Sequence, residues 1–187
     1  VTPLLLQSKK AICWLTIARG NGGVGKTFLS GNLAIASQKL TKKVLLVAAD
    51  LGLANADIVF GVHPEFSLQD AIFDGKKLDA ALVHTKHGVD LLAASSGSKE
   101  MVSLGQARMK MFINDLISFA SSYDVLMFDC AAGIDSNVTS FIAAAPQAII
   151  VATPQPTSLM DVYALIKLIH QDNLSENIGI VVNMADF

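Results

Sequence analysis

Continuous apolar runs alternate along the chain with segments in which apolar residues recur every three or four positions. Short apolar runs bounded by polar residues or glycine are typical of buried strands. We predict strands at 11–18, 43–50, 88–95, 124–130, 147–154 and 177–184. Helical spacing and capping residues predict helices at 26–40, 67–75, 107–122, 136–145 and 158–171.

Several of the predicted strands are apolar on both faces, as strands are when they lie between two layers of helices. Strands that alternate with helices indicate right-handed crossovers and a mainly parallel sheet. We therefore predict a three-layer α/β fold, with residues 1–187 forming a single domain. Ligands of such sheets bind beyond the carboxyl ends of the strands, so the loops that follow the strands are the place to look for a site.

Two predicted helices carry further expectations. In the first, Leu29, Leu33, Ala36 and Leu40 recur at helical spacing, which is the pattern that predicts the helix. In the last, Ser158 stands at the expected first residue. A serine hydroxyl can accept a hydrogen bond from a free amide of the first turn, so we expect Ser158 to cap this helix.

The loop after the first predicted strand reads GNGGVGKT, from residue 20 to residue 27. It fits the phosphate-loop pattern G-x-x-x-x-G-K-[ST], and it lies between a predicted strand and a predicted helix, as that motif requires. Glycines let the backbone wrap around a phosphate, whose charge faces successive N–H groups and the positive end of the helix. The alternative is a glycine-rich turn without a ligand. The expected nucleotide-binding residues are Gly20, Asn21, Gly22, Gly23, Val24, Gly25, Lys26, Thr27 and Phe28.

Two further loops add carboxylates to this picture. Asp50 ends the second predicted strand, and Asp129 lies at the end of the fourth, behind an apolar run. A carboxylate at such a place in a phosphate-loop fold can hold Mg²⁺ directly or through water, and the hydroxyl of Thr27 can ligate the same ion. The alternative for each aspartate is a turn or a helix cap.

The overall charge argues against nucleic acid as a partner. The net charge is −2 and the isoelectric point is near 6.1, and basic residues occur in pairs rather than clusters. Electrostatic binding to nucleic acid needs a basic field or patch, so we expect no specific nucleic-acid partner.

No apolar run reaches membrane-spanning length. Because the chain has no initiator methionine and stops soon after a predicted strand, we expect it to be trimmed at both ends.

The two cysteines, Cys13 and Cys130, lie in or beside apolar runs and form no CxxC pair. Buried, reduced thiols fit both positions. This usage indicates a reducing compartment, so we expect a cytoplasmic protein.

Four stretches together resemble the deviant-Walker ATPases of the MinD/ParA class. They are GGVGKT (22–27), AADLGLANADIVFG (48–61), FDCAAGID (128–135) and TPQPTSLMDVYALIK (153–167). DLGLANADI and PQPTS are most similar to the flagellar number regulator branch of that class, also called FlhG or FleN. Pilus-assembly relatives are the second-best match. The resemblance covers nearly the whole chain.

The resemblance implies an ATP-Mg²⁺ site between two subunits that dimerise face to face, with slow hydrolysis used as a switch. Lys26 would contact the β- and γ-phosphates and act in catalysis with Asp50, which would orient the attacking water. Thr27 would ligate Mg²⁺, and Asp129 would hold the ion through a water molecule. Asn183 would read the adenine edge, although a turn asparagine that closes a strand is the alternative.

The chain departs from the family pattern at three positions. Asn21 stands where the family has a lysine that reaches the partner's phosphates, and an amide cannot supply that charge. Ala48 replaces an aspartate found in many relatives, and Gln155 replaces a glutamate of the flagellar branch. These changes indicate either neutral drift or a weakened ATPase that still binds nucleotide.

Two functions follow from these observations. The first is a weakly hydrolysing, ATP-dependent dimerisation switch that controls flagellar number or placement. The alternative is a catalytically silent nucleotide-binding or interaction module of a pilus-assembly or polarity system. A small-molecule kinase ranks low because Arg19 and Arg108 are the only arginines that a lid could use. DNA partitioning also ranks low, for lack of a basic patch.

The resemblance also implies where the protein acts. Partners would be proteins of flagellar or polar assembly. Membrane contact at the inner face of the cell membrane would depend on a C-terminal amphipathic helix that this chain does not reach. We interpret the loop at 95–100 (SSGSKE), which follows the third predicted strand, as a border of the dimer face, with a small-residue anion loop as the alternative.

Two histidines and two methionines are the remaining candidate ligands. His84 and His87 stand three residues apart, and we favour a surface turn over a metal site because no carboxylate or cysteine partner is evident nearby in the sequence. Met109 and Met111 are expected to include core filler.

Overall fold

The computed structural model describes residues 12–20, 22–50, 56–94 and 105–186. Seven strands of these residues form one sheet, in the order β3-β4-β2-β5-β1-β6-β7. β3 pairs antiparallel with β4, and every other neighbouring pair is parallel. The strands are β1 (Cys13–Arg19), β2 (Val44–Ala49), β3 (Leu82–His84), β4 (Asp90–Ala93), β5 (Val125–Ala132), β6 (Gln147–Ala152) and β7 (Asn177–Val182).

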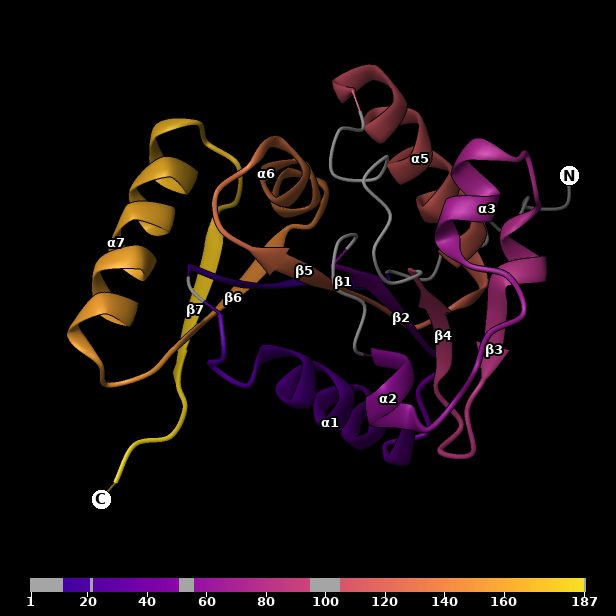
Figure 1. The fold of residues 1–187 in the computed structure, drawn as a ribbon, viewed down its shortest axis with the longest axis horizontal. Helices are drawn as coiled ribbons and strands as arrows, with labels where there is room; N and C mark the ends of the chain where they lie inside the picture. The colour runs from indigo at the N-terminus through magenta and orange to yellow at the C-terminus, as the bar shows by residue number, and fades with distance from the viewer. Residues whose placement is uncertain (1–11, 21, 51–55, 95–104, 187) are drawn as a thin grey trace, which may run out of the picture.

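Helices cover both faces of this sheet, as Figure 1 shows. On one face lie α1 (Lys26–Lys39) and α2 (Ala56–Phe60). On the other lie α3 (Leu68–Phe73), α5 (Gln106–Phe119), α6 (Ser136–Ala144) and α7 (Pro156–Gln171). Two short 3₁₀ turns, Leu78–Ala81 and Ala120–Ser122, join the elements at the β3 side of the sheet and after α5. The predicted three-layer α/β fold with a mainly parallel sheet is confirmed.

The core has two parts, one on each face of the sheet. Leu126 and Phe128 of β5 pack toward α5 and α6, whereas Met127 points to the α1 side. The central strands therefore bury both of their faces, which is why they read as continuous apolar runs. Each fully buried large apolar side chain contributes about 1.5–3 kcal/mol, so this double-sided core fixes the strand ends that carry the site.

Two elements escape the sequence prediction because they are short. α2 has 5 residues and β3 has 3, which is less than the window over which a periodic pattern can be recognised. Several predicted ends also shift inward: the third predicted strand narrows to Asp90–Ala93. β5 is the exception, because it continues past Asp129 to Ala132. Asp129 therefore lies within a strand and not at its end.

The start of α7 corrects the prediction for Ser158. The helix begins at Pro156, a residue favoured in the first turn because its missing N–H would be unpaired there anyway. Ser158 is buried inside the helix, and its Oγ accepts a hydrogen bond from the backbone N–H of Thr153 at 3.0 Å. Its hydroxyl ties the end of β6 to α7 rather than capping the helix.

α1 buries only part of its apolar pattern. Leu29 and Leu33 are partly buried and pack against the core, whereas Ala36 and Leu40 are exposed, Leu40 to 72%. The buried side of the helix also carries Ser30. This polar residue fits there because this part of the sheet presents a carboxylate, Asp129, to the helix.

β1 lies at the centre of the parallel sheet and positions the site. The chain passes from β1 to β2 on one side of it, and β6 lies on the other side. Such a reversal of strand order opens a crevice at the carboxyl ends of the strands. In the described part of the chain, no helix is long and apolar enough to cross a membrane.

Candidate functional site

The loop between β1 and α1 has the backbone that its glycines predict. Gly23 and Gly25 have φ angles of 79° and 81°, in the left-handed region that favours glycine. Gly25 is the N-cap residue of α1, and no side chain of the described residues caps this helix. A β-carbon on Gly25 would also lie 2.5 Å from Nδ2 of Asn183. The loop thus leads into the positive end of a 14-residue helix, where amide N–H groups can bind an anion.

Lys26 and Asp129 form a buried ion pair beneath this loop. Their side chains are fully or almost fully buried, and Nζ of Lys26 donates to Oδ1 of Asp129. Ser30, one turn further along α1, has its Oγ 2.8 Å from the same carboxylate oxygen and 2.9 Å from the carbonyl oxygen of Lys26. The structure therefore brings together two of the predicted site residues and adds Ser30.

Asp50 lies beside this pair, directly after β2. Ala48 and Ala49 are in register with Asp129 and Cys130 of the adjoining strand, so Asp50 follows one position beyond. Only 8% of Asp50 is exposed. Its Oδ2 atom lies 3.8 Å from Nη2 of Arg19, the last residue of β1.

The remaining predicted residues lie around the loop. Val24 is buried, and its carbonyl oxygen accepts a hydrogen bond from Nδ2 of Asn183 at 3.0 Å. Thr27 is half-buried in the first turn of α1, whereas Phe28 is 67% exposed. Asn183 follows β7, the edge strand beyond β6, and this hydrogen bond holds it next to the loop. Asn21 lies outside the described residues.

α7 contacts the loop at Gly20. A β-carbon on Gly20 would lie 2.3 Å from Cβ and 2.7 Å from the backbone carbon of Asp161. Real β-carbons do not approach other atoms this closely, so position 20 needs glycine for close packing against α7.

Ala48 and Gln155, two positions at which the chain departs from the family pattern, lie among the residues that the structure describes. Ala48 is buried next to Asp129, so an aspartate there would place a second carboxylate beside the ion pair. Gln155 is the exposed N-cap residue of α7. Both positions border the carboxyl edge of the sheet.

The cysteines differ from one another. Cys130 is buried next to Asp129, and its burial raises the pKa of the thiol far above the ordinary value. It is therefore an inert core residue. Cys13 is exposed at the start of β1, which contradicts the expectation of a buried thiol, because this strand begins before the layers of helices cover it.

The other features named in the sequence have structural roles. Nδ1 of His84 lies 2.5 Å from Oδ1 of Asp90, so a carboxylate partner does exist, across the β3–β4 pair. Within the described ranges, no three histidine, cysteine or acidic side chains come close enough to hold a metal ion among themselves. Met109 is buried in the core, and Met111 is 67% exposed.

Three residues near the loop are not among the predicted site residues: Arg19, Ser30 and Asp161. Arg19 directly precedes the loop, and Ser30 lies four residues after Lys26, on the same side of the helix. These spacings were signals that could have found both residues. Nothing in the local sequence indicates that Asp161 would reach Gly20.

The fold and the glycine loop define a phosphate-loop domain, and comparisons with known proteins agree. A family model described as an AAA domain matches residues 12–181. Antiactivator FleN of Pseudomonas aeruginosa is 39% identical over 171 residues, which are 91% of this chain and 61% of that protein. Flagellum site-determining protein YlxH of Helicobacter pylori is 33% identical over 172 residues, covering 92% of this chain and 58% of that protein.

Solved structures give the same class. The septum site-determining protein MinD of Pyrococcus horikoshii, complexed with Mg-ADP, has a TM-score of 0.79 and 26% identity. The match covers 92% of this chain and 70% of that one. The chain belongs to the AAA-domain family, and within it to the MinD/ParA class of ATPases, near the flagellar number regulators. It spans about three fifths of the length of the FleN and YlxH relatives.

Proposed function

We propose that this protein binds ATP with Mg²⁺ at the loop 20–27 and uses the nucleotide as a dimerisation switch in the control of flagellar number or placement. One observation carries the proposal. The loop, in which Gly23 and Gly25 have left-handed φ angles, leads into α1 next to the buried Lys26–Asp129 pair. The relatives support the biological role, since FleN and YlxH are named for flagellar functions.

The side chains at the loop fit a magnesium nucleotide. The loop amides and Lys26 are donors for phosphate oxygens, and the Asn183 amide adds a donor and an acceptor beside the loop. Thr27, Asp50 and Asp129 offer the oxygen ligands that Mg²⁺ prefers. The bound ion would neutralise phosphate charge. To reach a phosphate, Lys26 must exchange Asp129 for the nucleotide, and Ser30 would then keep the carboxylate in place.

Turnover is expected to be slow. Asp50 would orient the attacking water, as the resemblance implies. The loop 20–27 contains a single charged side chain, that of Lys26, because position 21 is an uncharged asparagine. Fewer cations near the terminal phosphate means less stabilisation of the charge that develops during its transfer.

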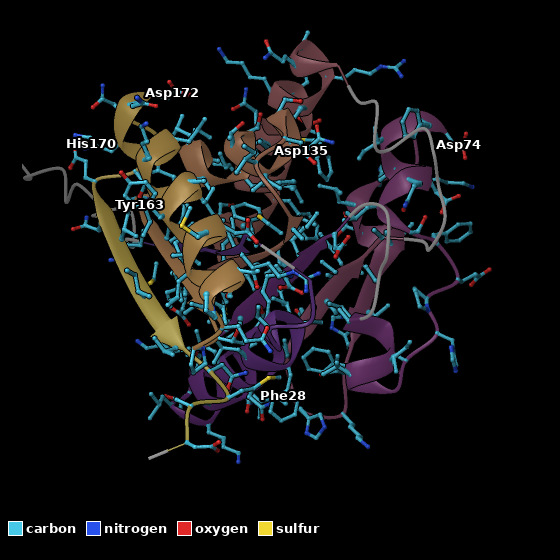
Figure 2. The ribbon with its side chains drawn as sticks, turned by 60° about the vertical axis from the view of Figure 1, so that its left-hand side comes forward. Phe28, Asp74, Asp135, Tyr163, His170 and Asp172 are labelled. Carbon is cyan, nitrogen blue, oxygen red and sulfur yellow. The ribbon has the colours of Figure 1, made fainter. Side chains whose placement is uncertain are left out.

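Exposed apolar side chains favour a dimer at the same edge of the molecule. Phe28 of α1 is 67% exposed, Met160 of α7 68%, and Ile134, after β5, 52%. All three follow the carboxyl ends of strands, as the glycine loop does. Figure 2 shows Phe28 on α1 and Tyr163 on α7, and the Tyr163 side chain is 65% exposed. Contiguous exposed apolar surface marks interaction faces, and we propose that these side chains belong to one.

The test of the switch is light scattering with Mg-ATP, a non-hydrolysable ATP analogue and Mg-ADP, paired with ATP turnover. We expect a shift from monomer to dimer with ATP or the analogue and a monomer with ADP. Turnover of wild type is compared with Asn21→Lys, and we expect the added charge to raise it. An unchanged mass with every nucleotide would contradict the switch, and equal turnover would contradict the limit set by Asn21.

A second candidate is a silent nucleotide-binding module of a pilus-assembly or polarity system. The uncharged position 21 favours it, because binding needs the loop and Lys26 while turnover needs more charge. Binding and dimerisation without measurable turnover would distinguish this candidate. Under either function we propose a cytoplasmic protein with protein partners of flagellar or polar assembly, and peripheral membrane contact only through further sequence.

A further inference from the structure

Arg19 extends from β1 toward the carboxylate of Asp50. It is the last residue of β1 and directly precedes the loop. β5 lies between β1 and β2 in the sheet, so the side chain crosses the end of β5 to reach Asp50. Only 17% of the Arg19 side chain is exposed. A largely covered arginine side chain at this edge is unusual, because arginine is mostly exposed unless it is paired.

One donor of the Arg19 guanidinium group, its buried Nε–H, is left without a partner by the described residues. The contact of Arg19 with Asp50 measures 3.8 Å, which is beyond hydrogen-bond distance. Buried donors in folded proteins nearly always have a partner, so the Nε–H of Arg19 indicates an acceptor that the described chain does not supply.

The charges at this edge indicate what that acceptor is. Lys26 is engaged by Asp129, and Arg19 faces Asp50, so the four side chains form two opposite-charge pairs. A nucleoside triphosphate carries several negative charges, and only one charged side chain belongs to the loop itself. Asp50 and Asp129 are the carboxylates expected at the terminal phosphate, and Arg19 lies beside one of them.

We propose that Arg19 donates hydrogen bonds to the terminal phosphate of the bound nucleoside triphosphate from within the same subunit, with Asp50 holding the guanidinium ready. This inference rests on the proposed nucleotide site and deepens it. A planar guanidinium can bind two phosphate oxygens at once, which an asparagine at position 21 cannot replace. Arg19 then makes the site selective for the triphosphate over the diphosphate.

The test compares Mg-ATP and Mg-ADP binding by calorimetry for wild type, Arg19→Met and Arg19→Lys. The loss of hydrogen bonds to a charged group weakens the binding affinity about 10- to 100-fold. We expect that loss for Mg-ATP with Arg19→Met, and less than about a 3-fold change for Mg-ADP. Arg19→Lys should recover part of the ATP affinity, because it keeps the charge and loses the planar fork.

The matched control is Arg108→Met, which changes the only other arginine, on α5 with its guanidinium 5.6 Å from the Phe73 ring. It should leave both affinities unchanged.

Equal losses of ATP and ADP affinity with Arg19→Met would overturn the proposal, because Arg19 would then only hold Asp50 in place. Unchanged affinities would overturn it as well. If Arg19→Met does not fold, Arg19→Lys decides: a ratio of ATP affinity to ADP affinity equal to that of wild type would overturn the proposal. Wild type that binds neither nucleotide would instead overturn the proposed function itself.

Discussion

The buried pair of Lys26 and Asp129 links the glycine loop to the centre of the sheet. Both residues are about 1% exposed, and Ser30 completes the contact. Two buried charges are stable only together, because removing one leaves the other without a partner in a poorly solvated place. The residue that is predicted to bind phosphate therefore also stabilises the nucleotide-free fold.

We predict that Lys26→Met lowers the free energy of unfolding by about 3–5 kcal/mol, since it leaves Asp129 buried and unpaired. Urea denaturation without nucleotide measures this. The double variant Lys26→Met/Asp129→Asn should recover about 2 kcal/mol or more, because no lone buried charge remains. Nucleotide binding should stay lost in both variants. A double variant that is less stable than Lys26→Met would contradict the account.

Alanine substitutions at Gly20 and Gly22 separate the cost of a steric clash from the general cost of replacing a loop glycine. We predict that Gly20→Ala lowers the free energy of unfolding by about 1–3 kcal/mol, because its β-carbon would overlap Asp161 on α7. Gly22→Ala is the matched control, since a β-carbon there would meet no atom within 4 Å. Urea denaturation of the two variants side by side checks the difference. Equal stability would show that α7 does not press on the loop.

At the scale of elements, helix α3 has an N-terminal cap that makes its stability depend on pH. Oδ2 of Asp70 accepts hydrogen bonds from the backbone N–H of Ser67 at 2.7 Å and from its hydroxyl at 2.6 Å. These bonds, led by the one from the hydroxyl, lower the pKa of Asp70 below its ordinary value of 3.8. The folded state therefore binds this proton more weakly than the unfolded state does.

A lowered pKa in the folded state means stability that is present above pH 3.8 and is lost as the pH falls through the folded value. We predict that Asp70→Ala costs on the order of 1 kcal/mol at neutral pH, as the loss of a cap does. The difference from wild type should shrink as the pH falls below 3.8 and through the lower pKa of the folded state. Urea unfolding at a series of pH values measures it, and a difference that stays constant with pH would be inconsistent with this linkage.

The sequence predicts some elements better than others for physical reasons. β5 and α5 are long and strongly patterned, so their packing and their local preferences agree. The five residues of α2 and the three of β3 are too short to show a period. In α1 the pattern is only partly informative: Leu29 and Leu33 pack against the core, but the helix also places Ser30 against Asp129.

For the site, the phosphate-loop motif predicts the loop and Lys26, because phosphate binding uses those residues at that spacing. The two aspartates are predicted separately, from their places at the ends of apolar strands. The contact of Arg19 with Asp50 depends on the order of the strands, which the local sequence does not encode. The contact of Gly20 with α7 is of the same kind. Such long-range neighbours appear only once the strands are placed.

At the scale of the whole molecule, the parallel strands deliver their loops to one edge. The end of β1 carries Arg19 and the loop, β2 leads to Asp50, β5 carries Asp129, and β7 leads to Asn183. Figure 1 shows these strands lying together between the two layers of helices. The central claim is that this edge is a nucleotide site in a protein of the MinD/ParA class.

Equilibrium binding of Mg-ATP and Mg-ADP to the wild-type protein by calorimetry tests that claim most directly, with Lys26→Met as the comparison. We predict saturable binding of both nucleotides to wild type. Lys26→Met should bind neither, because it lacks the ammonium group that the loop presents to phosphate. Wild type that binds neither nucleotide, or Lys26→Met that binds them equally well, would contradict the account.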